Sequence, residues 1–130
     1  MPMYERDGAS IFYEVRGSGF PILLIAPGGM RSEAAKWAGT PWNPAEDLRG
    51  YTVVAMDQRN AGSSTAPVSG DDGWHTYTAD QLGLMDHIGA DRFIVMGMCI
   101  GGPYAAGLIE AAPDRVAAAV MFQTIGYDNN

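Results

Sequence analysis

The single cysteine of the chain stands at the centre of a motif that could carry out nucleophilic chemistry. Cys99 lies in the segment Gly97-Met98-Cys99-Ile100-Gly101, which has the spacing of a nucleophile elbow with cysteine in place of the usual serine. Flanking glycines let a strand and a helix approach closely on either side of such a turn. The helix that follows directs its free N–H groups and the positive end of its dipole at the cysteine, which favours the thiolate. The motif predicts that Cys99 attacks a carbonyl carbon while the N–H of Ile100 faces the developing oxyanion.

A structural interpretation competes with this one, because a lone cysteine is most often a small buried hydrophobic residue. The context favours the elbow. The motif has glycines at Gly97 and Gly101, a β-rich apolar run before it and a helical segment after it. All three features are needed for a nucleophile elbow and none is needed for a buried cysteine.

The elements around the motif alternate between strands and helices. Apolar runs predict strands, and helical spacing between capping residues predicts helices. Strands are expected at residues 3–5, 11–16, 21–26, 51–56, 92–96 and 116–122, and helices at 45–49, 78–88 and 103–112. The alternation of strand and helix is typical of a mostly parallel sheet with crossover helices, so the predicted fold class is α/β.

The second helix is expected to begin at a capping box. In Thr78-Ala79-Asp80-Gln81, Thr78 would cap the helix and Gln81 would reach back to it. His75 then falls in the loop before the helix, on the same sheet edge as the elbow. His87 falls near the helix end, at the opposite edge.

Three further segments precede the elbow in a familiar order. Pro27-Gly28-Gly29-Met30 follows an early strand, and Asp57-Gln58-Arg59-Asn60-Ala61-Gly62-Ser63-Ser64 follows the next. Met85-Asp86-His87-Ile88-Gly89 then ends the helix before the elbow. With these segments the sequence resembles the α/β-hydrolase superfamily over nearly the whole chain. The resemblance implies that Gly29 or Met30 supplies a second oxyanion N–H beside that of Ile100. The chain has Pro27 where the family commonly has histidine, and Asn60 where its Asp-x-Arg-Gly turn has glycine.

The resemblance also implies a reaction class. Cysteine at the elbow is similar to dienelactone hydrolases, which indicates a hydrolase acting on an ester, thioester or lactone of a small molecule. Haloalkane dehalogenases and epoxide hydrolases use aspartate at this position, which argues against their chemistry here. Two alternatives stay open: an acyltransferase of the same fold, and a non-catalytic binding or interaction module.

A base for the cysteine is not evident in the sequence. The family order is nucleophile, acid and then histidine, but both histidines, His75 and His87, precede Cys99. The candidates are His75 as base and Asp128 as acid, because Asp128 follows the last expected strand. Asp57 is expected to hold its turn together.

Family members are longer than this chain, since large single α/β domains run to about 200–250 residues. Residues 1–130 are therefore expected to form the N-terminal portion of one domain, without its lid, last strands and closing helix. The strand at 116–122 would then be an exposed apolar edge that a second copy, a partner chain or the C-terminal half covers. The chain alone is not expected to be a stable monomer.

Composition excludes several classes. Fifteen acidic residues against eight basic ones give a formal charge of −7, which disfavours nucleic acid and anionic membranes as partners. No apolar stretch is long enough to span a bilayer and no apolar signal core opens the sequence, so a cytoplasmic location is expected. One cysteine excludes an internal disulfide and a cysteine-cluster metal site, and the motifs imply no metal or organic cofactor. Neither G-x-G-x-x-G nor a phosphate loop is present, which argues against a nucleotide-binding domain.

The three tryptophans have two possible roles. Trp37, Trp42 and Trp74 fall in loops on the expected active-site edge. They could line an acyl pocket, or they could anchor their loops to the sheet.

Overall fold

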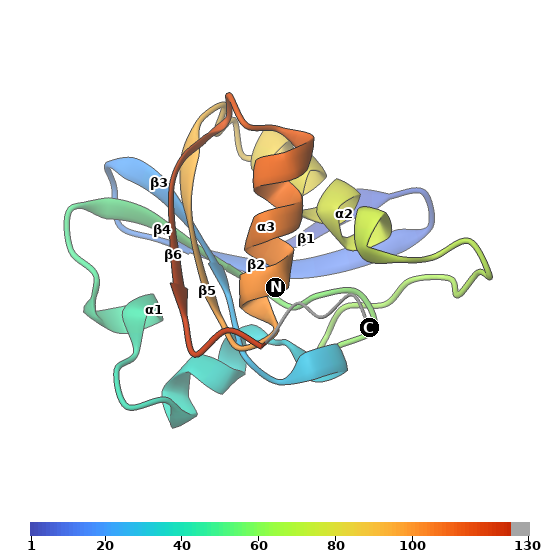
Figure 1. The fold of residues 1–130 in the computed structure, drawn as a ribbon, viewed down its shortest axis with the longest axis horizontal. Coiled ribbons are helices and arrows are strands. Elements are labelled where there is room, and N and C mark those ends of the chain that lie inside the picture. Colours follow the sequence, from blue (N-terminus) through green and yellow to red (C-terminus); the bar gives the residue numbers. More distant parts are fainter. Residues whose placement is uncertain (126–130) are drawn as a thin grey trace.

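The computed structural model describes residues 1–125, which form a six-stranded mixed sheet with helices on both faces (Figure 1). The strand order is β1-β2-β4-β3-β5-β6. The strands are β1 (Met3–Arg6), β2 (Ala9–Arg16), β3 (Phe20–Ile25), β4 (Tyr51–Met56), β5 (Phe93–Met98) and β6 (Val116–Phe122). The helices are the 3₁₀ segments η1 (Gly29–Arg31) and η2 (Ala34–Gly39) and the α-helices α1 (Pro44–Asp47), α2 (Trp74–His87) and α3 (Gly101–Ala111). The predicted α/β class is confirmed.

The four strands β4, β3, β5 and β6 run parallel, and β1 and β2 join the sheet antiparallel. β3 lies between β4 and β5, with Ile22 paired to Val53 on one side and to Ile94 on the other. The inner residues of β3 are buried, as its continuous apolar run predicts for a strand covered on both faces.

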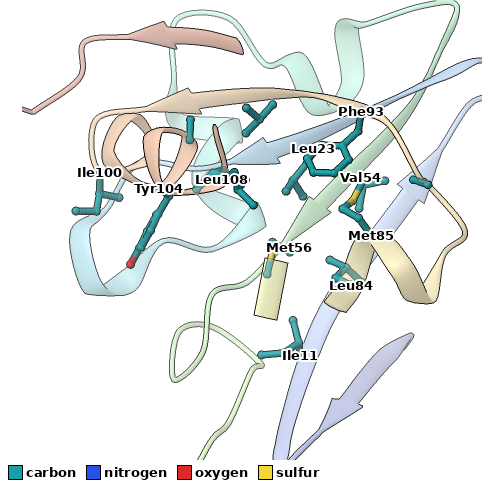
Figure 2. Packing of buried hydrophobic residues seen from close by; sticks show 14 of the residues in the cluster. Ile11, Leu23, Val54, Met56, Leu84, Met85, Phe93, Ile100, Tyr104 and Leu108 are labelled. Carbon is teal, nitrogen blue, oxygen red and sulfur yellow. The ribbon is translucent and has the colours of Figure 1, made fainter. Parts of the chain in front are cut away.

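Two apolar clusters cover the two faces of the sheet. The larger cluster joins the sheet to α2 and α3 and includes Leu23, Phe93, Leu84, Tyr104 and Leu108 (Figure 2). The smaller one lies under η2 and α1 and includes Trp37. Within residues 1–125, no helix is long and apolar enough to cross a membrane.

The chain changes direction across the sheet between β3 and β5. From β3 it passes to β4 by η1, η2 and α1, whereas from β5 it passes to β6, on the other side, by α3. Ligands of open α/β sheets bind at such switch points, beyond the carboxyl ends of the strands. This edge carries the glycine segment after β3 and the elbow after β5.

Helix α2 begins four residues before the predicted cap. The N–H of Gly73 donates to Oγ1 of Thr76 at 3.0 Å, so Thr76 closes the first turn. Thr78 lies inside the helix, and its hydroxyl donates to the carbonyl of Trp74 at 3.1 Å. The prediction of Thr78 as cap was wrong because the bond from Gly73 to Thr76 closes an additional first turn, with Gly73 as the N-cap. As a consequence His75 lies in the first turn of α2 and not in a loop.

β6 is the outermost strand of the sheet that residues 1–125 form. It pairs with β5, and residues 117–121 are exposed, with Val120 at 42% and Met121 at 41%. No charged residue or proline lies between Val116 and Phe122. The predicted exposed apolar edge is confirmed in the described structure, and such an edge favours pairing with another strand.

Candidate active site

Cys99 occupies the turn between β5 and α3 in a conformation that side chains rarely adopt. Its φ is +58°, in the left-handed region, whereas Ile100 after it is right-handed helical at φ −58°. Such a conformation costs a non-glycine residue about 1–3 kcal/mol and persists only where the surroundings impose it. The N–H of Cys99 donates to the carbonyl of Phe122 at 3.2 Å, and its carbonyl accepts from the N–H of Gly102 at 3.0 Å. The half-buried thiol is thus presented on a strained, tightly held turn.

Both elbow glycines are required by close backbone contacts. A Cβ on Gly97 would collide with the backbone carbonyl of Gly101. A Cβ on Gly101 would lie 2.5 Å from the carbonyl oxygen of Ile25 in β3. The expected close approach of strand and helix is therefore present at Gly97 and Gly101.

The glycine segment after β3 lies beside the elbow at the same sheet edge, because Ile25 and Gly97 are paired. Gly28 and Gly29 have φ of +121° and +59°, and a Cβ on Gly28 would lie 2.9 Å from the carbonyl oxygen of Arg31. Within residues 1–125, the N–H groups of Gly29, Met30 and Ile100 take part in no hydrogen bond. The three expected oxyanion donors thus lie at one sheet edge, where no acceptor among residues 1–125 pairs with them.

A hollow of about 540 Å³ lies next to the elbow. We call it the elbow hollow; six of the residues that line it are Met30, Arg59, Trp74, Tyr77, Ile100 and Tyr104. The ring of Tyr104 lies 5.4 Å from that of Trp74 and 5.1 Å from that of Tyr77, between ring centroids. Figure 2 shows Tyr104 extending from α3 with its hydroxyl turned away from Leu23 and Phe93. Burial raises the pKa of both Tyr77 and Tyr104, so these phenols stay neutral.

Asp57 holds its turn together, as expected. Its carboxylate accepts from the N–H of Ala34 at 2.7 Å and from the N–H of Ser63 at 2.8 Å. Asn60, which replaces the glycine of the family pattern, has φ +60°, and its side-chain oxygen accepts from the N–H of Ala66 at 2.9 Å. Asparagine tolerates the left-handed region better than other side chains, so the turn keeps its shape.

An ion pair that the sequence did not reveal connects this turn to α2. Arg59 donates to Asp80 through Nε at 2.6 Å and Nη2 at 2.9 Å, and Asp80 is fully buried. This hydrogen-bonded contact raises the pKa of Arg59. Nη1 of Arg59 lies 3.8 Å from Asp72, which also lines the elbow hollow. A charged residue on the apolar side of a predicted helix, as Asp80 is, was the signal that could have indicated such a pair.

The structure does not bring either histidine to Cys99. His75 lines a different groove between α2 and α3, with Glu110 and Ala111 from the far end of α3. His87 lies at the last turn of α2, with its ring centroid 5.1 Å from Tyr4, at the edge opposite the elbow as predicted. Asp128, the candidate acid, lies outside the described residues.

Two of the three tryptophans take the two expected roles. Trp37 is buried against Phe122 and anchors its segment to the sheet, and Trp42 is half exposed away from the hollow. Trp74 lines the elbow hollow. Among the described residues, no group of three or more histidine, cysteine, aspartate or glutamate side chains is placed to hold a metal ion.

Several known proteins are similar to this chain in sequence and in fold. A non-heme haloperoxidase of Rhodococcus erythropolis is 32% identical over 120 residues, which cover 92% of this chain and 42% of that protein. Epoxide hydrolase A of Mycobacterium tuberculosis is 36% identical over 106 residues, which cover 77% of this chain and 30% of that protein. The solved structure of an N-acyl homoserine lactone degrading enzyme superposes with a TM-score of 0.79 at 27% identity, covering 95% of this chain and 45% of that one.

The chain spans less than half the length of each of these proteins. The match to the family described as the alpha/beta hydrolase fold covers residues 21–129 and includes both the glycine segment and the elbow. This chain belongs to the alpha/beta hydrolase fold family.

Proposed function

We propose that the protein hydrolyses an ester, thioester or lactone of a small molecule, with Cys99 as nucleophile. The observation that carries the proposal is the left-handed backbone of Cys99 at the turn between β5 and α3. A core cysteine has no need of that strain, whereas a nucleophile elbow depends on it to expose the reacting atom.

The reaction would proceed in two steps. The Cys99 thiolate attacks the carbonyl carbon, and the N–H of Ile100, with that of Gly29 or Met30, stabilises the oxyanion. Collapse of the tetrahedral intermediate expels the alcohol or thiol, which takes up a proton, and leaves an acyl thioester on Cys99. Water then attacks this thioester, which releases the acid and restores the thiol.

A general base must take and return these protons. We propose that residues 1–130 are the N-terminal portion of one domain, and that the base is a histidine in the portion that pairs with β6. Two observations support this: the chain spans under half the length of its relatives, and β6 is an exposed apolar edge. A lactone substrate is supported by the related structure of a lactone degrading enzyme.

A second candidate function, a non-catalytic binding module on the same scaffold, is favoured by one observation. His75 and His87 both lie away from Cys99, so the described residues place no histidine at the elbow. An acyltransferase would differ from the hydrolase in the second step, in which another nucleophile would replace water. A cytoplasmic location stays a prediction of the sequence.

Turnover of a p-nitrophenyl ester tests the proposal, with the protein expressed from its complete open reading frame. Cys99→Ala should lower kcat/KM by at least about a hundredfold, because it removes the nucleophile. Cys99→Ser is the matched variant, which places a hydroxyl nucleophile where the thiol stood. Full activity in Cys99→Ala would overturn the proposal. Release of acid from the wild type without added acceptor separates the hydrolase from the acyltransferase.

A further inference from the structure

We propose that the elbow hollow binds an uncharged aromatic group in the acyl portion of the substrate, stacked against Trp74, Tyr77 and Tyr104. This inference rests on the proposed function, since it names the substrate class of the same site. It is carried by the position of the hollow, by the arrangement of its aromatic rings and by the pairing of its charges.

The position of the hollow connects it to the reacting atoms. Ile100 directly follows the candidate nucleophile, and Met30 belongs to the glycine segment that faces it. Both line the hollow, so a group bound there lies beside the expected oxyanion donors. The hollow has a volume of about 540 Å³. Small-molecule sites usually have volumes of roughly 300–1,000 Å³.

The aromatic rings form a wall with one open face. Tyr104 is buried at 2% exposure in the large apolar cluster and forms the fixed part of the wall. Trp74 is 55% exposed, and its ring is inclined at 68° to the ring of Tyr104. The ring of Tyr77 is inclined at 33° to the ring of Tyr104. An exposed indole beside two tyrosine rings would gain apolar burial and ring contact if an aromatic group entered.

The charges in the hollow are paired with one another. Arg59 donates two hydrogen bonds to Asp80, and its remaining nitrogen faces Asp72. A carboxylate on the ligand would meet Asp72 as well as Arg59, and an ammonium would meet Arg59 as well as Asp72. Since neither would find a free opposite charge, an ionised group would lose hydration without compensation. This favours an uncharged ligand.

Binding measured without turnover tests the inference. In a Cys99→Ala background of the protein expressed from its complete reading frame, ligand-observed NMR gives the Kd of methyl 3-phenylpropanoate and of methyl propanoate. We expect the phenyl ester to bind more tightly. Trp74→Ala should weaken its binding by about three- to tenfold, the worth of one aromatic contact, and leave methyl propanoate unchanged.

Trp42→Ala is the matched control, because Trp42 is also an exposed tryptophan but lies outside the hollow. It should bind both esters as the parent does. If Trp74→Ala unfolds, Tyr77→Leu tests the same wall and should show the same selective loss. Three results would overturn the inference. The first is equal binding of the two esters, and the second is an equal loss of affinity in the Trp74 and Trp42 variants. The third is tighter binding of an analogue with a ring carboxylate.

The two proposals can fail separately. If turnover persists in Cys99→Ala, the assignment of Cys99 as nucleophile is wrong. The aromatic site is still supported if binding depends on Trp74. Turnover that depends on Cys99 while both esters bind equally overturns the aromatic site alone.

Discussion

Arg59 and Asp80 form a two-point hydrogen-bonded ion pair, at 2.6 and 2.9 Å, between the turn after β4 and the buried face of α2. Arg6 of β1 adds a third contact to Asp80 at 3.3 Å. The pair attaches the middle of α2 to this turn, and Trp74 and Tyr77 from the first turn of the helix line the elbow hollow. The geometry of the candidate site therefore depends on a contact that lies outside the nucleophile motif.

Asp80→Asn should destabilise the fold strongly. Removing one partner leaves Arg59 buried without its counter-charge, which costs about 3–5 kcal/mol. Asp86→Asn is the control, because Asp86 forms an ion pair with Arg115 at 2.7 Å but its side chain is 66% exposed. Such a surface pair is worth roughly 0–1 kcal/mol. Urea unfolding measures both variants, and similar losses in the two would contradict the role given to Asp80.

Gly97→Ala should impair folding and the elbow together. The new methyl group would meet the backbone carbonyl of Gly101, which cannot move without shifting α3. Gly39→Ala is the matched change, since nothing lies within 4 Å of the position where its Cβ would stand. We expect Gly39→Ala to alter the free energy of unfolding by no more than about 0.5 kcal/mol. A Gly97→Ala protein as stable as Gly39→Ala would show that the close approach is not present in solution.

Stability should fall at alkaline pH through the buried phenols. Burial raises the pKa of Tyr104 and Tyr77 above their ordinary value of 10.0, so above that pH the unfolded chain loses protons that the folded chain retains. Their contribution is fully present below pH 10 and is lost as the pH rises further. Tyr104→Phe should flatten this part of the curve in urea titrations between pH 9 and 11. An unchanged slope would contradict the burial of this hydroxyl.

The exposed strand β6 should make the 130-residue chain associate. Sedimentation of this chain should show oligomers or aggregates, and Val120→Lys should reduce them, because a charge on an edge strand opposes pairing. Val68→Lys is the control, since Val68 is 86% exposed in a loop. A monodisperse monomer that unfolds cooperatively would contradict the prediction that this chain needs a cover for β6.

The parallel strands could be predicted because each is a run of mostly apolar residues, whether the strand is buried, as β3 is, or exposed, as β6 is. The bounds of β4 and β6 are those predicted, and β3 and β5 differ by one or two residues at their ends. The tight turn at Cys99 could also be predicted, because the close approach of strand and helix requires glycine at positions 97 and 101. An epoxide hydrolase is among the relatives, although this chain has cysteine at position 99, where the resemblance implies aspartate for that class.

Features that depend on contacts between distant segments could not be predicted. The N-cap of α2 is Gly73, whose N–H donates to Thr76 in the first turn, and the sequence pattern favoured a start at Thr78. Because α2 begins at Trp74, His75 lies in its first turn and lines a groove away from the elbow. The pairing of Arg59 with Asp80, and the choice of Trp74 over Trp37 and Trp42 as the residue in the hollow, require the packing of α2 on the sheet.

The most direct test of the central claim is the mass of the protein during turnover. Incubated briefly with an activated ester and quenched in acid, the protein expressed from its complete reading frame should gain the mass of one acyl group. Peptide mapping should place that group on Cys99, and Cys99→Ala should show no adduct. An acyl group on another residue, or rapid turnover by Cys99→Ala, would contradict the assignment of Cys99 as the nucleophile.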